Sequence, residues 1–85
     1  MKYTVVLSRQ AENFYKKLDK KIKTQVMDCL LGLEEDAYVG KRLHGDLKDS
    51  FSLRAGKKLR VIYNIEDKDK IVYVIAIGPR RNVYE

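Results

Sequence analysis

Three apolar stretches follow one another in the second half of the chain, with only short polar turns between them. Ser50–Arg54 and Leu59–Ile65 largely alternate apolar and polar side chains, and Ile71–Ile77 is apolar on both faces. Alternation with a period of two is typical of β-strands, and a strand apolar on both faces is typical of the centre of a sheet. Strands joined by turns as short as Ala55–Lys58 and Asp67–Lys70 run antiparallel. These residues therefore predict an antiparallel meander.

The first half of the chain predicts one strand and two helices. Residues 3–8 alternate as a strand does, and Ser8 and Asp19 are suited to cap the helices that follow. In each helix the apolar residues recur at helical spacing and form one stripe. The first stripe is Ala11, Phe14, Tyr15 and Leu18, and the second is Ile22, Val26, Cys29, Leu30 and Leu33. The acidic run 34–36 lies at the C-terminal end of the second helix, where the helix dipole disfavours negative charge. We therefore expect the helix to end near there.

These elements predict an α+β fold in the order β-α-α-β-β-β, with a four-stranded antiparallel sheet. The N-terminal helical hairpin is expected to cover one face of the sheet, and residues 37–49 are expected to form a loop. A chain of 85 residues has room for one domain, residues 1–85. The other face is expected to be open, and it would carry Ser50, Ser52, Arg54, Arg60 and Asn64.

The net charge of +6 is unevenly distributed. Residues 1–40 hold seven Lys or Arg and six Asp or Glu (+1), whereas residues 41–85 hold eleven and six (+5). This excess favours an anionic partner, nucleic acid first of all; a merely solubilising lysine-rich surface is the alternative.

The single cysteine, Cys29, forms no internal disulfide, and no apolar run reaches the roughly 20 residues of a membrane helix. The N-terminus is too short and charged for a signal peptide, so we expect a cytoplasmic protein with no membrane partner.

Two arginine motifs and a tyrosine are the strongest candidates for chemistry. Arg60 lies within a strand, Arg80 and Arg81 follow Gly78-Pro79, and Tyr84 comes shortly after. A guanidinium stays charged and presents a planar fork to phosphate oxygens, and a tyrosine ring can stack on a base. Each also has a plainer explanation, as a solvated strand arginine, a charged tail or a loosely packed tyrosine. Asp67 or Asp69 could pair with Arg60 only if their turn folded back.

Further candidates flank the first turn of the meander. Arg54, Lys57 and Lys58 could bind substrate there, although lysines in turns are often only solvated. The only histidine, His44, cannot act as both base and acid, and Cys29 is expected in the core. The acids have no metal-ligand spacing, and no cofactor motif is present, so neither a metal nor a cofactor is expected.

The ordered set of these motifs resembles the RelE/ParE superfamily of type II toxin–antitoxin toxins over nearly the whole chain. The motifs are Arg42-Leu43-His44-Gly45, Ser52-Leu53-Arg54, Arg60-Val61-Ile62-Tyr63, Ile77-Gly78 and Arg80-Arg81-Asn82-Val83-Tyr84. The RelE branch, which is similar in fold to small microbial ribonucleases, cleaves mRNA in the ribosomal A site without metal and so inhibits translation.

The resemblance assigns catalytic roles to Arg60, Arg80 and Tyr84 and substrate contacts to Arg54, Lys57, Lys58 and Arg81. It implies attack of the RNA 2′-hydroxyl on the neighbouring 3′-phosphate. It also implies a RelB-like cognate antitoxin that wraps the helices and covers the basic face. The branch carries lysines on the strand before the turn, where this chain has Ser50 and Ser52. That departure leaves the general base open, and it leaves open a ParE-like toxin that inhibits DNA gyrase by protein contact, or a simple RNA-binding module.

Overall fold

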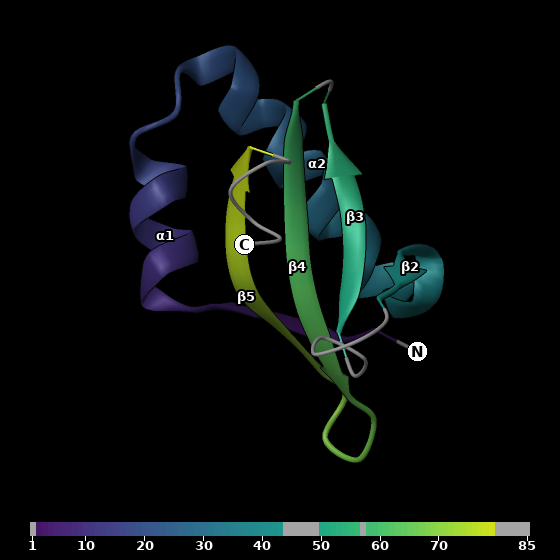
Figure 1. Cartoon of the computed structure of the whole chain (residues 1–85). Coiled ribbons are helices and arrows are strands. Elements are labelled where there is room, and N and C mark those ends of the chain that lie inside the picture. Colours follow the sequence, from purple (N-terminus) through teal and green to yellow (C-terminus); the bar gives the residue numbers. More distant parts are fainter. Residues whose placement is uncertain (1, 44–49, 57, 80–85) are drawn as a thin grey trace.

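The computed structural model describes residues 2–43, 50–56 and 58–79 and shows two helices packed on one face of a curved sheet (Figure 1). The element order is β1, α1, α2, η1, β2, β3, β4 and β5, where η1 is a short 3₁₀ helix. The helices are α1 (Arg9–Lys16) and α2 (Lys20–Glu35), and η1 is Ala37–Val39. The strands are β1 (Thr4–Leu7), β2 (Lys41–Arg42), β3 (Phe51–Ala55), β4 (Leu59–Glu66) and β5 (Ile71–Pro79).

Both predicted helix caps are confirmed. The Ser8 side chain accepts a hydrogen bond from the backbone N–H of Ala11, and the Asp19 side chain accepts one from Ile22. Each cap satisfies a backbone donor that the first helical turn would leave unpaired. The predicted stripes face the sheet, and α2 ends at Glu35, as the acidic run indicated.

The sheet has five strands in the order β1-β5-β4-β3-β2, so the prediction of four antiparallel strands is wrong in two respects. Strand β1 pairs with β5 in parallel. The other three pairs, β5 with β4, β4 with β3 and β3 with β2, are antiparallel. Tight turns fix the direction only of the meander. Because two helices separate β1 from the meander, β1 is free to lie parallel to β5. Strand β2 falls inside the predicted loop, because two residues are too short to show an alternating pattern.

A bulge in β5 sets which of its side chains face the helices. Ile62 pairs with Ala76 but Tyr63 pairs with Val74, so Ile75 is an extra residue on β5. Val74 and Ile77 can therefore both be fully buried in the core under the helices. Strand β1 ends before it reaches Ile77 of β5. The side-chain amide of Gln10 satisfies the backbone of Ile77 instead: it donates to the Ile77 carbonyl and accepts from the Ile77 N–H.

Tyr63 is the largest fully buried side chain of the core. Its hydroxyl donates to the Ala37 carbonyl at 2.9 Å and accepts from the Gly40 N–H at 3.0 Å. A Cβ on residue 40 would collide with this hydroxyl, so glycine is needed there. The contact joins η1 and the start of β2 to the middle of the sheet. No helix among the described residues is long and apolar enough to cross a membrane.

Candidate nucleic-acid interface

Arg54 and Arg60 lie directly opposite each other on β3 and β4. Cross-strand partners project from the same face of a sheet with Cβ atoms about 4.5–5.5 Å apart. Their strand neighbours Leu53, Leu59 and Val61 pack in the core beneath the helices, so both arginines lie on the face without helices. Arg54 is exposed and Arg60 is half-buried.

No carboxylate in the described ranges pairs with either guanidinium; the ion pairs there are Lys2–Glu35 and Lys16–Glu12. Strands β2 and β3 contain no acidic residue, and β4 has one only at its far end, Glu66. Like charges directly opposite each other repel, so an anion between the two guanidiniums would be stabilising. A phosphate, which accepts hydrogen bonds from guanidinium forks, is the ligand best matched to it.

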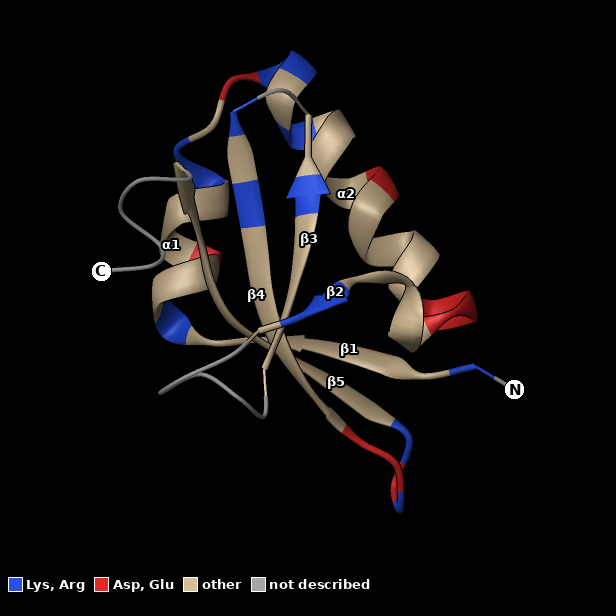
Figure 2. Ribbon diagram, turned by 45° about the vertical axis from the view of Figure 1, so that its right-hand side comes forward, with Lys and Arg blue, Asp and Glu red and all other residues tan. Residues whose placement is uncertain are grey.

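Lys41 adds a third cation that the sequence did not indicate. It pairs with Ser52, which is two residues from Arg54 on β3. Diagonal neighbours of this kind are about 7–8 Å apart, within reach of long side chains. We call Lys41, Arg54 and Arg60 the cationic cluster; Figure 2 shows blue bands on the neighbouring strands β2, β3 and β4. Only the structure reveals it, because β2 has no sequence pattern of its own.

Tyr73 is a second residue that the sequence analysis missed. It pairs with Asn64, whose side chain lies on the same face as Arg60, and it is 43% exposed. An exposed ring on the face of the cationic cluster is suited to stack on a base. The only sequence signal is a tyrosine inside an otherwise aliphatic strand, and a strand that is apolar on both faces predicts burial rather than an exposed ring.

The face without helices is less open than expected. Ser50 and Ser52 are 5% and 4% exposed, and Ile62 is 3% exposed. The pairing of β2 makes β3 an inner strand of the sheet. Ser50 also donates to the Asn64 side chain at 2.7 Å. The two serines are therefore poor substitutes for surface lysines, and the exposed cations lie around them.

Asp67 does not pair with Arg60. Its carboxylate accepts hydrogen bonds from the hydroxyls of Tyr3 and Tyr38, at the end of the sheet away from the cationic cluster. These bonds hold the pKa of Asp67 below its ordinary value. The bond to Asp67 raises the pKa of Tyr3 to about 12. These two hydrogen bonds fasten the β4–β5 turn to η1 and to the residue before β1, and Asp67 is therefore not a partner of Arg60.

Of the remaining residues that the sequence singled out, Lys58 and Cys29 lie in the described part of the chain and five others do not. Lys58 lies at the start of the β4 side of the hairpin and is exposed. Cys29 packs against the core, as expected, and its thiol donates to the Arg54 carbonyl at 3.4 Å; burial raises the pKa of that thiol. Within the described ranges, no three His, Cys, Asp or Glu side chains gather as a metal site would require. The other candidates, His44, Lys57, Arg80, Arg81 and Tyr84, lie outside the described residues.

Comparisons with known proteins agree with this architecture. A family model described as a ParE-like toxin of type II bacterial toxin–antitoxin systems matches residues 5–85. No curated protein matches the chain. Among solved structures, a chain of the toxin–antitoxin complex RelBE2 from Mycobacterium tuberculosis is 29% identical, with a TM-score of 0.84 over 94% of this chain and 100% of that one.

Two further structures extend the likeness. A chain of the archaeal RelE–RelB complex from Pyrococcus horikoshii OT3 is 25% identical, with a TM-score of 0.76 over 96% of this chain and 99% of that one. The YoeB/ParE toxin from Agrobacterium tumefaciens is 17% identical, with a TM-score of 0.80 over 91% and 98%, which shows a shared fold. The α+β, RelE-like fold that the sequence predicted is confirmed.

Proposed function

This chain belongs to the ParE-like toxins of type II bacterial toxin–antitoxin systems, and we propose that it is an endoribonuclease that cleaves mRNA on the ribosome and so inhibits translation. The observation that carries the proposal is the pairing of Arg54 with Arg60 on the face without helices. Two guanidiniums without a described acidic partner form a site for a phosphate, and RNA supplies phosphates in series.

The proposed reaction is a transesterification within the RNA. The 2′-oxygen forms a bond to the adjacent phosphorus while the bond from phosphorus to the 5′-oxygen of the next nucleotide breaks. The 2′-hydroxyl loses its proton, the leaving 5′-oxygen gains one, and the products are a 2′,3′-cyclic phosphate and a 5′-hydroxyl. Arg60, and Arg80 by the family resemblance, bind the developing dianionic phosphorane. Removal of one such donor typically costs about 10²–10³ in rate.

The other cations and the tyrosines would orient the RNA strand. Arg54 and Lys41 lie where they can hold the phosphates on either side and favour a deprotonated 2′-hydroxyl. By resemblance, Lys57, Lys58 and Arg81 contribute further phosphate contacts, and Tyr84 stacks on a base. Correct orientation of the 2′-oxygen relative to the phosphorus is itself a large part of such catalysis.

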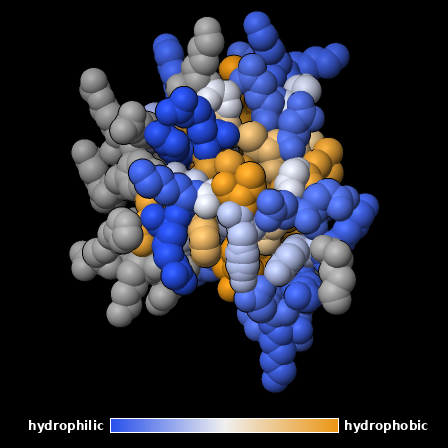
Figure 3. Space-filling model, turned by 90° about the vertical axis from the view of Figure 1, so that its right-hand side faces the viewer, coloured by the Kyte–Doolittle hydropathy of each residue, from blue (hydrophilic) through white to orange (hydrophobic). Residues whose placement is uncertain are grey.

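We also propose a RelB-like antitoxin as partner. The exposed apolar residues include Met27 and Leu31, one turn apart on α2, and Tyr38 and Val39 in η1. Figure 3 shows hydrophobic atoms gathered at the centre of one side of the molecule, bordered by hydrophilic ones. Toxin–antitoxin complexes are among the similar structures, and a partly disordered antitoxin that folds on such a surface would restrain the toxin.

A gyrase inhibitor of the ParE type is the second candidate. The observation that favours it is that the cationic cluster contains no imidazole or carboxylate among the described residues to accept the 2′-proton. A toxin that acts by protein contact needs no such group. Under this alternative, the cationic cluster would bind an acidic protein surface.

Primer extension on mRNA translated in a cell extract tests the proposal. We expect codon-phased cleavage with the wild type and with Lys68→Ala, a control in the distant β4–β5 turn. Arg60→Ala should lower cleavage about 10²–10³-fold, and Arg60→Lys should recover little, because an ammonium lacks the planar fork. Absence of cleavage by the wild type, or cleavage that survives both Arg60→Ala and Arg80→Ala, would overturn the nuclease assignment. A parallel supercoiling assay would identify gyrase inhibition.

A further inference from the structure

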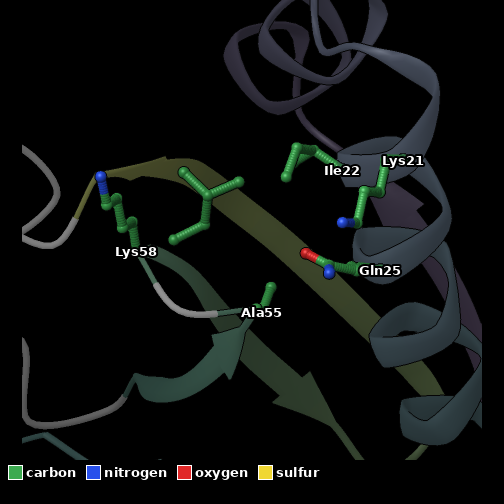
Figure 4. Close-up of a pocket in the computed structure, with 7 residues that line it drawn as sticks. Lys21, Ile22, Gln25, Ala55 and Lys58 are labelled. Atoms are coloured by element: carbon green, nitrogen blue, oxygen red, sulfur yellow. The ribbon is translucent and has the colours of Figure 1, made fainter.

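A pocket lies between the beginning of α2 and the hairpin that joins β3 to β4 (Figure 4). Its volume is about 400 Å³, within the range of pockets that bind small molecules. The helix contributes Lys21, Ile22 and Gln25, and the hairpin contributes Gly56, Lys58 and Leu59. The family resemblance assigned no role to the helix side of this pocket.

The lining combines an apolar wall with one amide and two cations. Ile22 and Leu59 are half-buried and pack against the core. Figure 4 shows Lys21 and Gln25 pointing from α2 into the pocket, with Lys58 on the opposite side. The first turn of α2 contains no acidic residue, and neither lysine pairs with a carboxylate in the part of the chain that the structure describes.

The Gln25 side chain offers both a hydrogen-bond donor and an acceptor, and it forms no hydrogen bond with another described residue. Gly56 leaves room for it. This glycine has φ of 76°, and a Cβ at residue 56 would lie 2.5 Å from the Gln25 Oε1. An amide with both functions free, beside an apolar wall, is suited to the edge and the flat face of a nucleobase.

The pocket also lies at the end of the hairpin that carries Arg54 and Arg60. Lys58 precedes Arg60 by two residues, which is about 7 Å along a strand. The pocket lies on the helix side of this hairpin, whereas Arg54 and Arg60 project from the face without helices, so an RNA strand held by the two arginines would reach the pocket around the end of the hairpin. A simple inorganic anion would use the lysines alone and would leave the amide and the apolar wall without a role.

We propose that this pocket receives a nucleobase next to the cleaved bond and gives the toxin a sequence preference. Gln25 pairs with the polar edge of the base, Ile22 and Leu59 contact its face, and Lys21 and Lys58 hold the adjacent phosphates. Adenine is the base expected to bind best, because a carboxamide pairs with it in a bidentate manner. This inference deepens the proposed function and rests on it for the identity of the strand.

Titration of the full-length protein with the four nucleoside monophosphates, followed by NMR, tests the pocket directly. We expect AMP to shift the side-chain amide signals of Gln25 and to bind more tightly than CMP, GMP or UMP. Gln25→Leu should weaken AMP binding about tenfold and abolish the preference. Lys21→Ala should weaken AMP but not adenosine, whereas Lys68→Ala should change neither. Unfolding curves of each variant establish that it folds.

Three results would overturn the proposal that the pocket binds a nucleobase. In the first, Gln25→Leu leaves AMP binding unchanged. In the second, all four nucleotides and inorganic phosphate bind equally, and in the third, AMP shifts only signals of elements that do not line the pocket. Arg42→Ala should retain AMP binding, since Arg42 neither lines the pocket nor belongs to the cationic cluster.

The cleavage assay separates this inference from the proposed function. Cleavage whose sequence preference is the same in wild type and Gln25→Leu overturns the base pocket and leaves the nuclease intact. AMP binding at Gln25 with no mRNA cleavage by the wild type overturns the nuclease, and the pocket survives as a nucleotide site. A changed preference in Gln25→Leu supports both.

Discussion

Arg54 lies directly across from Arg60 on neighbouring antiparallel strands, with no acidic partner for either in the described residues. Such a pair costs stability in the free protein and becomes favourable when an anion lies between the two guanidiniums. If a phosphate binds there as proposed, part of its binding energy is the relief of repulsion already present in the fold. The change in unfolding temperature on addition of an anion therefore tests whether the two arginines form an anion site.

Arg54→Gln should stabilise the free protein at low ionic strength by about 0.2–1 kcal/mol, because it removes the repulsion from Arg60. Added sulfate should raise the unfolding temperature of the wild type more than that of the variant and so reduce or reverse the difference. Thermal unfolding at several sulfate concentrations measures both effects. Lys68→Gln is the control, since Lys68 lies beside Asp67 and its loss should not stabilise. A destabilising Arg54→Gln at low salt would contradict the repulsion.

Lys41→Ala should weaken binding of single-stranded RNA and lower its salt dependence. The loss of one phosphate contact reduces the slope of log K against log salt by about 0.7. Arg42→Ala is a matched control from the same short strand. Arg42 pairs with Phe51 and lies over its ring at 5.7 Å, on the opposite side from the cationic cluster. Equal effects of the two substitutions in filter-binding or anisotropy titrations would remove Lys41 from the interface.

The sequence predicted those features that local chemistry determines. Ser8 and Asp19 cap the helices as expected, and the alternation around Val61 and Tyr63 places those side chains in the core. Each of these depends on neighbouring residues and a fixed period. The order of the two helices and of β1, β3, β4 and β5, and the face that the helices cover, followed from them.

Other features depend on partners distant in the chain and left no sequence signal. The pairing of Lys41 with Ser52 comes from a two-residue strand, which is too short for periodicity. The bulge at Ile75 is invisible because β5 is apolar on both faces, so a shift of one residue does not change the pattern. The pocket around Gln25 needs Ala55 of the hairpin, which lies thirty positions after Gln25 in the sequence. Only coordinates bring such residues together.

Tyr63→Phe should destabilise the fold by about 1–3 kcal/mol, because the Ala37 carbonyl and the Gly40 N–H would both lose their partner. Urea unfolding measures the loss. Tyr73→Phe is the matched control: its ring is exposed on the other face, and the change should stay within about 0.5 kcal/mol. If the two substitutions have the same effect, the hydroxyl of Tyr63 is not what holds η1 to the sheet.

Stability should depend on pH through Asp67 and its two tyrosines. The pKa of Asp67 is lowered from 3.8, so its contribution is present above pH 3.8 and is lost as pH falls through the lowered value. The pKa of Tyr3 is raised from 10.0 to about 12, so that contribution is complete below pH 10 and is lost as pH rises through 12. The difference in unfolding temperature between wild type and Asp67→Asn should therefore be constant from about pH 5 to 9 and shrink at both extremes. Tyr3→Phe should keep the acid limb, through Tyr38, and lose most of the alkaline one. Asp69→Asn, in the same turn, is the control, because it leaves the hydrogen bonds of Asp67 to Tyr3 and Tyr38 in place. A difference for Asp67→Asn that is flat from pH 2 to 12 would contradict the role of these bonds.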